Sequence, residues 1–167
     1  VAFGYGMTHL KEGDEVLITL AEHASNTLPW FEVAKHTGAI IKYIDLDEEG
    51  KVTLENVRKA VTEHTKIISL AQITNVLGYL APIKEICNFA HEHDIVVCVD
   101  GAQSAPHHAV DVQDLDVDFF AFSGHKMCGP TGVGVLYGKY HLLEEMTPTR
   151  FGGGSNARYN SCGLVKL

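Results

Sequence analysis

The 167-residue chain is 46% hydrophobic and 20% charged, close to the average for globular domains, so its composition excludes a disordered or fibrous protein. Its formal net charge is −8 and no basic stripe is visible, which argues against nucleic acid as a partner. No apolar run approaches the roughly 18 residues that cross a bilayer. The first residues show no signal-peptide pattern. We therefore expect no membrane contact and a location in the cytoplasm or an organelle matrix.

The cysteines are widely spaced, which fits neither a disulfide framework nor a zinc site. The histidines also lack metal-ligand spacing, so we expect no metal. Cys87 follows the apolar stripe of a predicted helix and Cys98 lies inside a predicted strand, so both are interpreted as small buried hydrophobes. Cys128 lies two residues after Lys126; we interpret it as a packing residue, with a catalytic nucleophile as the alternative. Cys162 lies in a tail without a clear pattern.

Apolar runs alternate with helical patterns along most of the chain. Gly38 is a typical helix-ending residue, and Thr53 is a typical N-cap. Residues 147–167 show no clear period, and the chain stops within what looks like another apolar element. The predicted strands are residues 15–19, 39–47, 66–74, 95–100, 118–123 and 132–138, and the predicted helices are residues 28–37, 53–61, 82–94 and 140–146.

Most of these strands lack polar alternation, which is typical of strands that are covered on both faces. The sequence therefore predicts an α/β fold with a mostly parallel sheet sandwiched by helices. Residues 1–167 are expected to form one incomplete domain. Both ends fall inside what look like secondary-structure elements, so we interpret the chain as an excerpt from a longer enzyme.

Polar side chains gather where the predicted strands end. In an open α/β sheet, ligands bind beyond the carboxyl ends of the strands, so these residues are expected to share one edge. Each of them alone has an ordinary interpretation as a turn, cap or solvated residue. Together they form the candidate site: His23, Asn26, Asn75, Asp100, Gln103, Ser123, His125 and Lys126.

The chemistry of this set favours pyridoxal phosphate as the cofactor. A lysine that binds an aldehyde must lose its proton near neutral pH, which burial and cationic neighbours promote. A carboxylate such as Asp100 keeps the pyridine nitrogen protonated, and only the protonated ring is an effective electron sink. The segments "SGHK" and "GPTG" offer a hydroxyl, an imidazole and open backbone amides for a phosphate.

Four segments also resemble a known family: "EHASNTLPW", "ITNVLG", "VDGAQSAPHHAVDVQDLDVDFFAFSGHK" and "SGHKMCGPTGVGVLYGK". They are similar to the aminotransferase class V, fold-type I pyridoxal-phosphate enzymes, specifically the group II cysteine desulfurase and selenocysteine lyase branch. The resemblance runs from about Gly6 to Gly154, and its motifs occur in the family's order. It therefore implies the large cofactor-binding domain of such an enzyme.

The resemblance implies a role for each residue around the cofactor ring. Lys126 would carry the cofactor covalently, and Asp100 would pair with the pyridine nitrogen. Gln103 would hydrogen-bond the ring hydroxyl oxygen. His23 would stack on the ring face and move protons, which makes it a catalytic residue together with Lys126.

The remaining candidates would hold the phosphate and the substrate. Ser123 and His125 would bind the phosphate. Asn75 would lie near the cofactor hydroxyl and the substrate carboxylate, and Asn26 is predicted to contact the substrate as well.

The implied reaction converts L-cysteine to L-alanine and passes the sulfur to an enzyme cysteine as a persulfide, which feeds iron–sulfur cluster assembly. A homodimer and a sulfur-acceptor protein are the implied partners. Selenocysteine lyase activity, another class V aminotransferase or lyase activity, and a catalytically silent truncated domain remain alternatives.

Several parts of the family pattern are not found in this chain. The segment "SNARYNSCG" after Gly154 departs from the pattern. A phosphate-binding threonine loop is expected before Val1. The acceptor cysteine and the arginine that anchors the substrate, with the small C-terminal domain, are expected after Leu167. The excerpt alone is therefore expected to be inactive.

Overall fold

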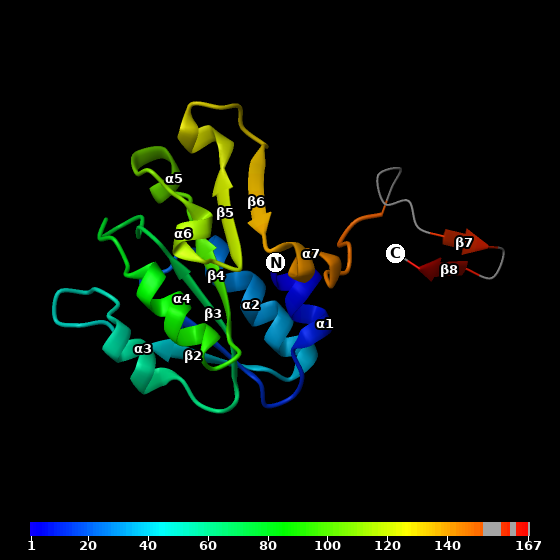
Figure 1. The fold of residues 1–167 in the computed structure, drawn as a ribbon, viewed down its shortest axis with the longest axis horizontal. Coiled ribbons are helices and arrows are strands. Elements are labelled where there is room, and N and C mark those ends of the chain that lie inside the picture. The colour runs from blue at the N-terminus through cyan, green and yellow to red at the C-terminus, as the bar shows by residue number, and fades with distance from the viewer. Residues whose placement is uncertain (152–157, 161–162, 167) are drawn as a thin grey trace.

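A computed structural model describes residues 1–151, 158–160 and 163–166. Its centre is a six-stranded sheet in the order β2-β1-β3-β4-β5-β6 (Figure 1). Strands β1 to β5 run parallel and β6 runs antiparallel to β5, which confirms the predicted α/β fold with a mostly parallel sheet. The six strands are β1 (Glu15–Thr19), β2 (Ile40–Ile44), β3 (Thr65–Ala71), β4 (Val96–Asp100), β5 (Phe119–Ser123) and β6 (Gly134–Gly138).

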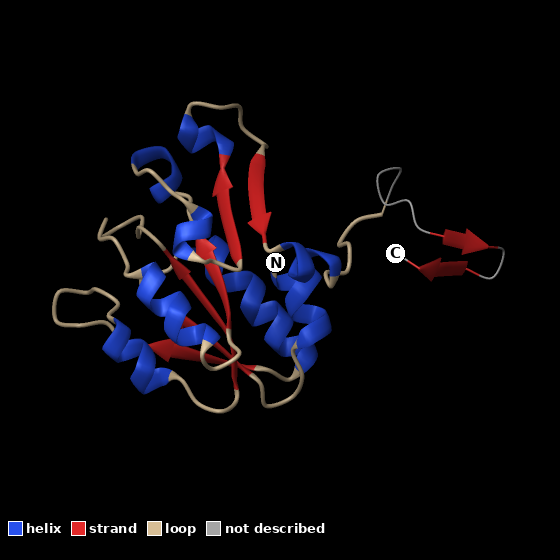
Figure 2. Ribbon diagram, in the orientation of Figure 1, coloured by secondary structure: helices blue, strands red, loops and turns tan. Residues whose placement is uncertain are grey.

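Helices cover both faces of this sheet (Figure 2). The longer ones are α2 (Ala24–Thr37), α3 (Leu54–Ala60), α4 (Ile83–His91) and α7 (Tyr140–Glu144). Short helical segments that the sequence did not predict are η1 (Ala2–Gly6), α1 (Met7–His9), α5 (Ser104–His107), α6 (Val112–Leu115) and η2 (Gly124–Met127). Within the described part of the chain, no helix is long and apolar enough to span a membrane.

Two predicted helix boundaries are confirmed, and others are wrong, including the end of α4, which lies at His91 and not at Asp94. Gly38 ends α2 in the left-handed conformation at φ 77°, and the Thr53 side chain caps α3 by accepting a hydrogen bond from the Asn56 backbone N–H at 3.1 Å. Helix α2, however, begins four residues before the predicted Leu28. The earlier start is stabilised by His23, whose ring nitrogen Nδ1 caps the first turn.

A second sheet lies in the tail, where the sequence indicated only an apolar element at the end of the chain. Strands β7 (Arg158–Asn160) and β8 (Gly163–Lys166) pair antiparallel with each other. Cys162 lies outside the described residues.

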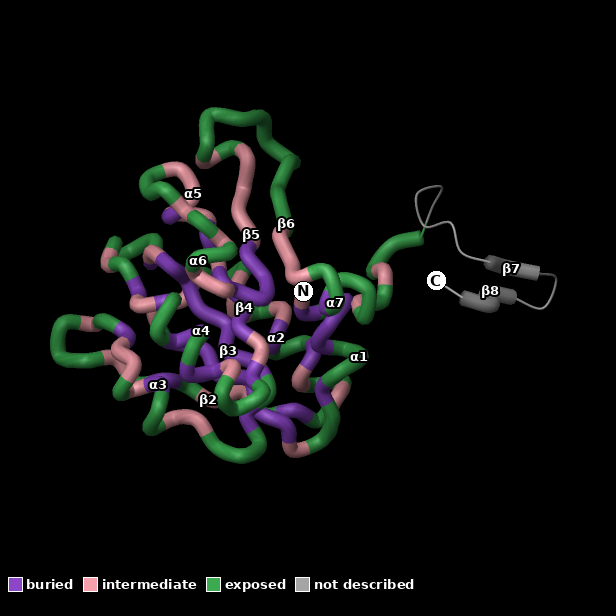
Figure 3. The backbone as a smooth tube through the Cα atoms, in the orientation of Figure 1, coloured by how far each residue is buried: buried purple, intermediate pink, exposed green. Residues whose placement is uncertain are grey.

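The central strands β1, β3 and β4 are buried on both faces, as their continuous apolar runs predicted (Figure 3). The edge strands β2 and β6 are mostly exposed or half-buried, which the same reasoning did not predict. Successive side chains of a strand point to opposite faces, and Phe119 and Phe120 illustrate the consequence. Phe119 joins a cluster with Trp30 and Val33 of α2, whereas Phe120 joins a cluster on the face that α3 and α4 cover. The two clusters hold the strands rigidly and thereby fix the positions of their carboxyl ends.

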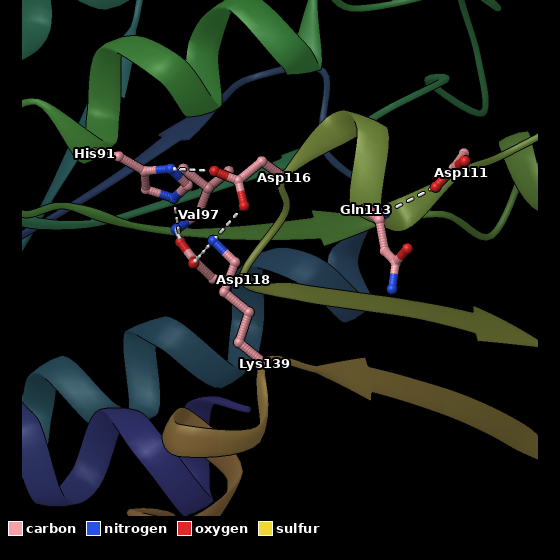
Figure 4. A network of polar contacts seen from close by, with 7 residues as sticks. All are labelled: His91, Val97, Asp111, Gln113, Asp116, Asp118 and Lys139. Atoms are coloured by element: carbon pink, nitrogen blue, oxygen red, sulfur yellow. Dashed lines mark hydrogen bonds and ion pairs between the residues drawn. The ribbon is translucent and has the colours of Figure 1, made fainter.

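An ion-pair network ties the amino-terminal ends of β4 and β5 together (Figure 4). Asp118, just before β5, accepts hydrogen bonds from the Val97 backbone N–H at 2.7 Å and pairs with Lys139 at 2.9 Å. His91 of α4 lies between Asp116 and Asp118, at 3.0 and 2.9 Å from their carboxylates. The network joins α4 and the end of β6 to the start of β5, away from the candidate site.

Candidate active site

A pocket of about 370 Å³ opens beyond the carboxyl ends of β4 and β5, beside the start of α2. This is the edge at which open α/β sheets bind ligands. The structure brings six of the eight predicted residues together in its wall: His23, Asn26, Asp100, Ser123, His125 and Lys126.

A tight turn delivers Lys126 to the pocket. Strand β5 ends at Ser123 and runs directly into the 3-10 turn η2. Gly124 donates its backbone N–H to Val133 at 2.8 Å, and its carbonyl accepts the Gly129 N–H at 2.9 Å. A β-carbon at Gly129 would lie only 2.9 Å from that carbonyl oxygen, so the turn requires glycine there. The glycines of "SGHKMCGPTG" therefore serve to fold the chain back and leave Lys126 half-buried at the pocket.

Asp100 is the last residue of β4 and is also half-buried. One carboxylate oxygen accepts a hydrogen bond from the Ala102 backbone N–H at 2.8 Å, which fixes the side chain. The next residue, Gly101, must be a glycine, because a β-carbon at that position would overlap the buried ring of Phe120. Within residues 1–151, neither Asp100 nor Lys126 forms an ion pair, so both charges are available to a ligand in the pocket.

The start of α2 supplies His23 and Asn26. The His23 Nδ1 accepts the Ser25 backbone N–H at 3.2 Å, so a neutral ring carries its proton on Nε2. Asn26 donates its amide to Glu22 at 2.8 Å and accepts a hydrogen bond from the Ser69 hydroxyl at 2.8 Å. The orientation of the Asn26 amide is thus fixed by two partners.

Two predicted residues do not line this pocket. Gln103 stands at the N-cap position of α5, three residues after Asp100, and its side chain makes no capping hydrogen bond. Asn75 lies in the loop after β3 and lines an adjacent pocket of about 440 Å³, whose wall also includes His23. His23 therefore stands between the two pockets.

Sequence reasoning did not select Glu22. Burial, the largest influence, raises the pKa of its carboxyl group, although hydrogen bonds from Asn26 and Thr19 act in the opposite direction. A signal was present in the sequence, because Glu22 precedes His23 and stands four residues before Asn26, the spacing of neighbours on a helix.

The structure buries Cys87 and Cys98, as predicted, but it exposes Cys128, so the interpretation of Cys128 as a packing residue is wrong. Cys87 and Cys98 are buried, and burial raises the pKa of their thiols to about 12 and about 11. Both thiols are therefore protonated and unreactive at neutral pH. Cys98 also forms part of the pocket wall. Cys128 is exposed, with its backbone in the left-handed region at φ 59°.

Comparison with known proteins agrees with this geometry. A profile of the aminotransferase class-V family matches residues 1–165, and the chain belongs to this family. A protein of Halalkalibacterium halodurans named "Probable cysteine desulfurase" is 55% identical over 153 residues, which are 92% of this chain and 38% of that protein.

Solved structures show the same fold. The cysteine desulfurase CsdA from Escherichia coli, as its S-sulfonic acid, superposes with a TM-score of 0.95 at 41% identity, over all of this chain and 42% of CsdA. A C-DES mutant with glycine covalently linked to its PLP cofactor superposes with a TM-score of 0.84 at 27% identity, over 99% of this chain and 45% of C-DES. The chain thus spans about two fifths of the length of the relatives that it matches.

Proposed function

We propose that this chain is the cofactor-binding part of a pyridoxal-phosphate-dependent cysteine desulfurase. The observation that carries the proposal is the shared pocket of Lys126 and Asp100 at the carboxyl ends of two neighbouring strands. The names of the relatives support cysteine as the substrate.

The residues that are present fit the cofactor. The pocket volume of about 370 Å³ lies within the range of small-molecule sites. Its wall offers an amine for the aldehyde, a carboxylate for the ring nitrogen, and a hydroxyl and an imidazole for the phosphate: Lys126, Asp100, Ser123 and His125. When bound, pyridoxal phosphate supplies an electron sink for negative charge that develops on the substrate carbon.

The residues around the ring would have three distinct tasks. The Lys126 amine would hold the cofactor covalently and would then move a proton to or from the substrate carbon. The Asp100 carboxylate would hold the proton on the ring nitrogen. The exposed ring of His23, fixed at its Nδ1, would lie on the cofactor face with the Nε2 proton free to be donated.

The remaining residues would hold the two ends of the ligand. Ser123 and His125 would bind the phosphate beside the turn η2. Gln103 would approach the ring hydroxyl from the start of α5. Asn75 and Asn26 would contact the substrate, which is supported by their positions in the two adjacent pockets that share His23.

In the proposed reaction, the carbon–sulfur bond of L-cysteine breaks and a proton replaces the sulfur, which leaves L-alanine. The sulfur forms a new bond with the thiol of an enzyme cysteine, which becomes a persulfide. Cys87 and Cys98 are unsuited to this step because their thiols are protonated at neutral pH. We place the acceptor cysteine outside these residues, together with the substrate-anchoring arginine and the small domain.

The wider setting is also part of the proposal. A homodimer would complete the site, and a sulfur-acceptor protein would carry the persulfide sulfur to iron–sulfur cluster assembly. The three cysteines that the structure describes are free thiols, which supports a reducing compartment such as the cytoplasm or an organelle matrix.

A turnover assay tests this function. The full-length protein should form L-alanine from L-cysteine in the presence of a reductant, and Lys126→Ala should abolish turnover. Asp100→Asn keeps an acceptor for the Ala102 N–H, so it should still bind cofactor but lose about 100-fold in rate, the order expected for removal of a preorganised charge. Asp94→Asn, an exposed change elsewhere, is the control.

Two outcomes would contradict the proposal. Wild-type protein that releases alanine only from selenocysteine would replace the substrate and leave the cofactor assignment in place. A near wild-type rate for Asp100→Asn would remove Asp100 from its assigned role.

A further inference from the structure

A partly buried chain of hydrogen bonds links Glu22, which lines the second pocket, to the wall of the first pocket. The Glu22 carboxylate accepts hydrogen bonds from the Thr19 hydroxyl at 2.8 Å and from the Asn26 amide at 2.8 Å. The Asn26 side-chain oxygen in turn accepts a hydrogen bond from the Ser69 hydroxyl at 2.8 Å. Ser69 also interacts with the Cys98 thiol. Since Asn26 and Cys98 both line the pocket, the chain links Glu22 to the pocket wall at two points.

The hydrogen-bond partners of the Glu22 carboxylate all donate a hydrogen bond to it. Besides Thr19 and Asn26, the backbone of Ala71 contributes a hydrogen bond that lowers the pKa of the Glu22 carboxyl group. The Thr19 oxygen already accepts the Ala21 backbone N–H at 3.1 Å, so its hydrogen points to Glu22. Three donors favour the ionised form of the carboxylate, because that form accepts hydrogen bonds and has none to donate.

This anion has no cationic partner among residues 1–151. The titratable groups whose charges interact with it are acidic or neutral: Asp100 and Cys98 on β4, and Tyr79 in the loop after β3. The neighbouring negative charge of Asp100 raises the pKa of Glu22 further, after burial. Glu22 and Asp100 thus place two carboxylates beside the pocket, and within residues 1–151 neither of them forms an ion pair.

We propose that Glu22 is a positioning residue of this site, which holds Asn26 and adds a second negative charge that favours the protonated, cationic form of the bound cofactor. The proposal rests on the function proposed above. Glu22 acts indirectly, by holding Asn26 and through the electrostatic effect of its negative charge on the cofactor. It is therefore distinct from Asp100, which is assigned to direct contact with the ring.

The test uses the visible absorbance of the cofactor bound to the full-length protein, titrated with pH in the absence of substrate. Glu22→Gln keeps the size of the side chain and removes its charge. The midpoint of the absorbance change should fall by about one pH unit, which is the effect of losing one charge about 12 Å away at an effective dielectric constant near 20. Glu92→Gln, an exposed glutamate that makes no side-chain contact to the site, should leave the midpoint unchanged.

A purely structural role predicts a different pattern. In that case Glu22→Gln would keep the wild-type midpoint, and this result would overturn the proposal. Melting temperatures of the cofactor-free proteins show whether each variant folds.

If Glu22→Gln does not fold, the same pH titration of Thr19→Val tests the proposal. It keeps the shape of a buried side chain and removes one hydrogen-bond donor from the carboxylate. A smaller fall of the midpoint in the same direction is expected, and an unchanged midpoint would contradict the proposal. Wild-type protein that never acquires visible absorbance would overturn the proposed function, and this inference with it.

Discussion

His23 combines a structural and a proposed chemical task in one side chain. Its Nδ1 caps α2 by accepting the Ser25 backbone N–H, while its exposed ring faces both pockets. Histidine is an uncommon N-cap, and asparagine is among the best. The two tasks can therefore be separated by substitution.

We expect His23→Ala to destabilise the protein by about 1 kcal/mol through loss of the cap, whereas His23→Asn should keep near wild-type stability. Both variants should lose about 10- to 100-fold in turnover, since both lack the ring. Chemical denaturation and the alanine assay measure the two effects. Wild-type turnover in His23→Asn would reduce His23 to a capping residue.

At the scale of elements, the contact between β4 and β5 sets the position of Asp100. The Gly101 backbone N–H donates to the Ala121 carbonyl at 2.8 Å, and the Phe120 ring occupies the space where a β-carbon of residue 101 would lie. Phe120 is buried in the core and cannot move aside. The glycine after Asp100 is therefore a requirement of packing.

Gly101→Ala should destabilise the protein by about 2 to 3 kcal/mol, as overpacking of a core does, and should weaken cofactor binding because Asp100 shifts. Denaturant unfolding and a cofactor titration measure both effects. The double variant Gly101→Ala/Phe120→Leu should recover part of the stability, because the smaller side chain makes room. A single variant as stable as wild type would show that the strands separate without cost.

The network at the other end of β5 predicts a pH dependence. A hydrogen bond from Lys139 is the largest influence on the pKa of Asp116 and lowers it, and His91 lowers it further. The folded pKa therefore lies below the unfolded value of about 3.9. The contribution of Asp116 to stability is present above that unfolded value and is lost as the pH falls through the folded pKa.

Asp116→Asn tests this contribution without backbone strain, because asparagine tolerates the left-handed conformation of residue 116 at φ 54°. The variant should be less stable than wild type at pH 6, and the difference should shrink as the pH falls below about 4, where the Asp116 carboxylate of the unfolded chain becomes protonated. Denaturation at several pH values measures it. Asp111→Asn, which preserves the cap of α6, should match wild type throughout. A deficit for Asp116→Asn that persists unchanged at pH 3 would contradict the ionic explanation.

For the whole molecule, the sequence was most informative where the sheet is buried on both faces. Continuous apolar runs such as residues 95–100 can only be covered strands, and parallel strands bring their carboxyl ends to one edge. That reasoning predicted the six residues that line the pocket. The antiparallel direction of β6 could not be predicted, because the pattern of a strand is the same in both directions.

The features that sequence reasoning missed depend on tertiary contacts. Helices α5 and α6 have four residues each, too few to show a helical period. The start of α2 depends on an unusual cap. The position of Glu22 beside His23 and four residues before Asn26 was the one signal for it in the sequence, and the contacts with Thr19 and Asn26 show how its carboxylate is held.

The most direct measurement of the proposed site identifies the lysine that carries the cofactor. The full-length protein should be yellow, and reduction with sodium borohydride should fix the cofactor irreversibly to one peptide. Protease digestion and mass spectrometry should then place it on Lys126, within the segment "SGHK" at the end of β5. Reduced cofactor on any other lysine, or none on the protein, would contradict the proposed site.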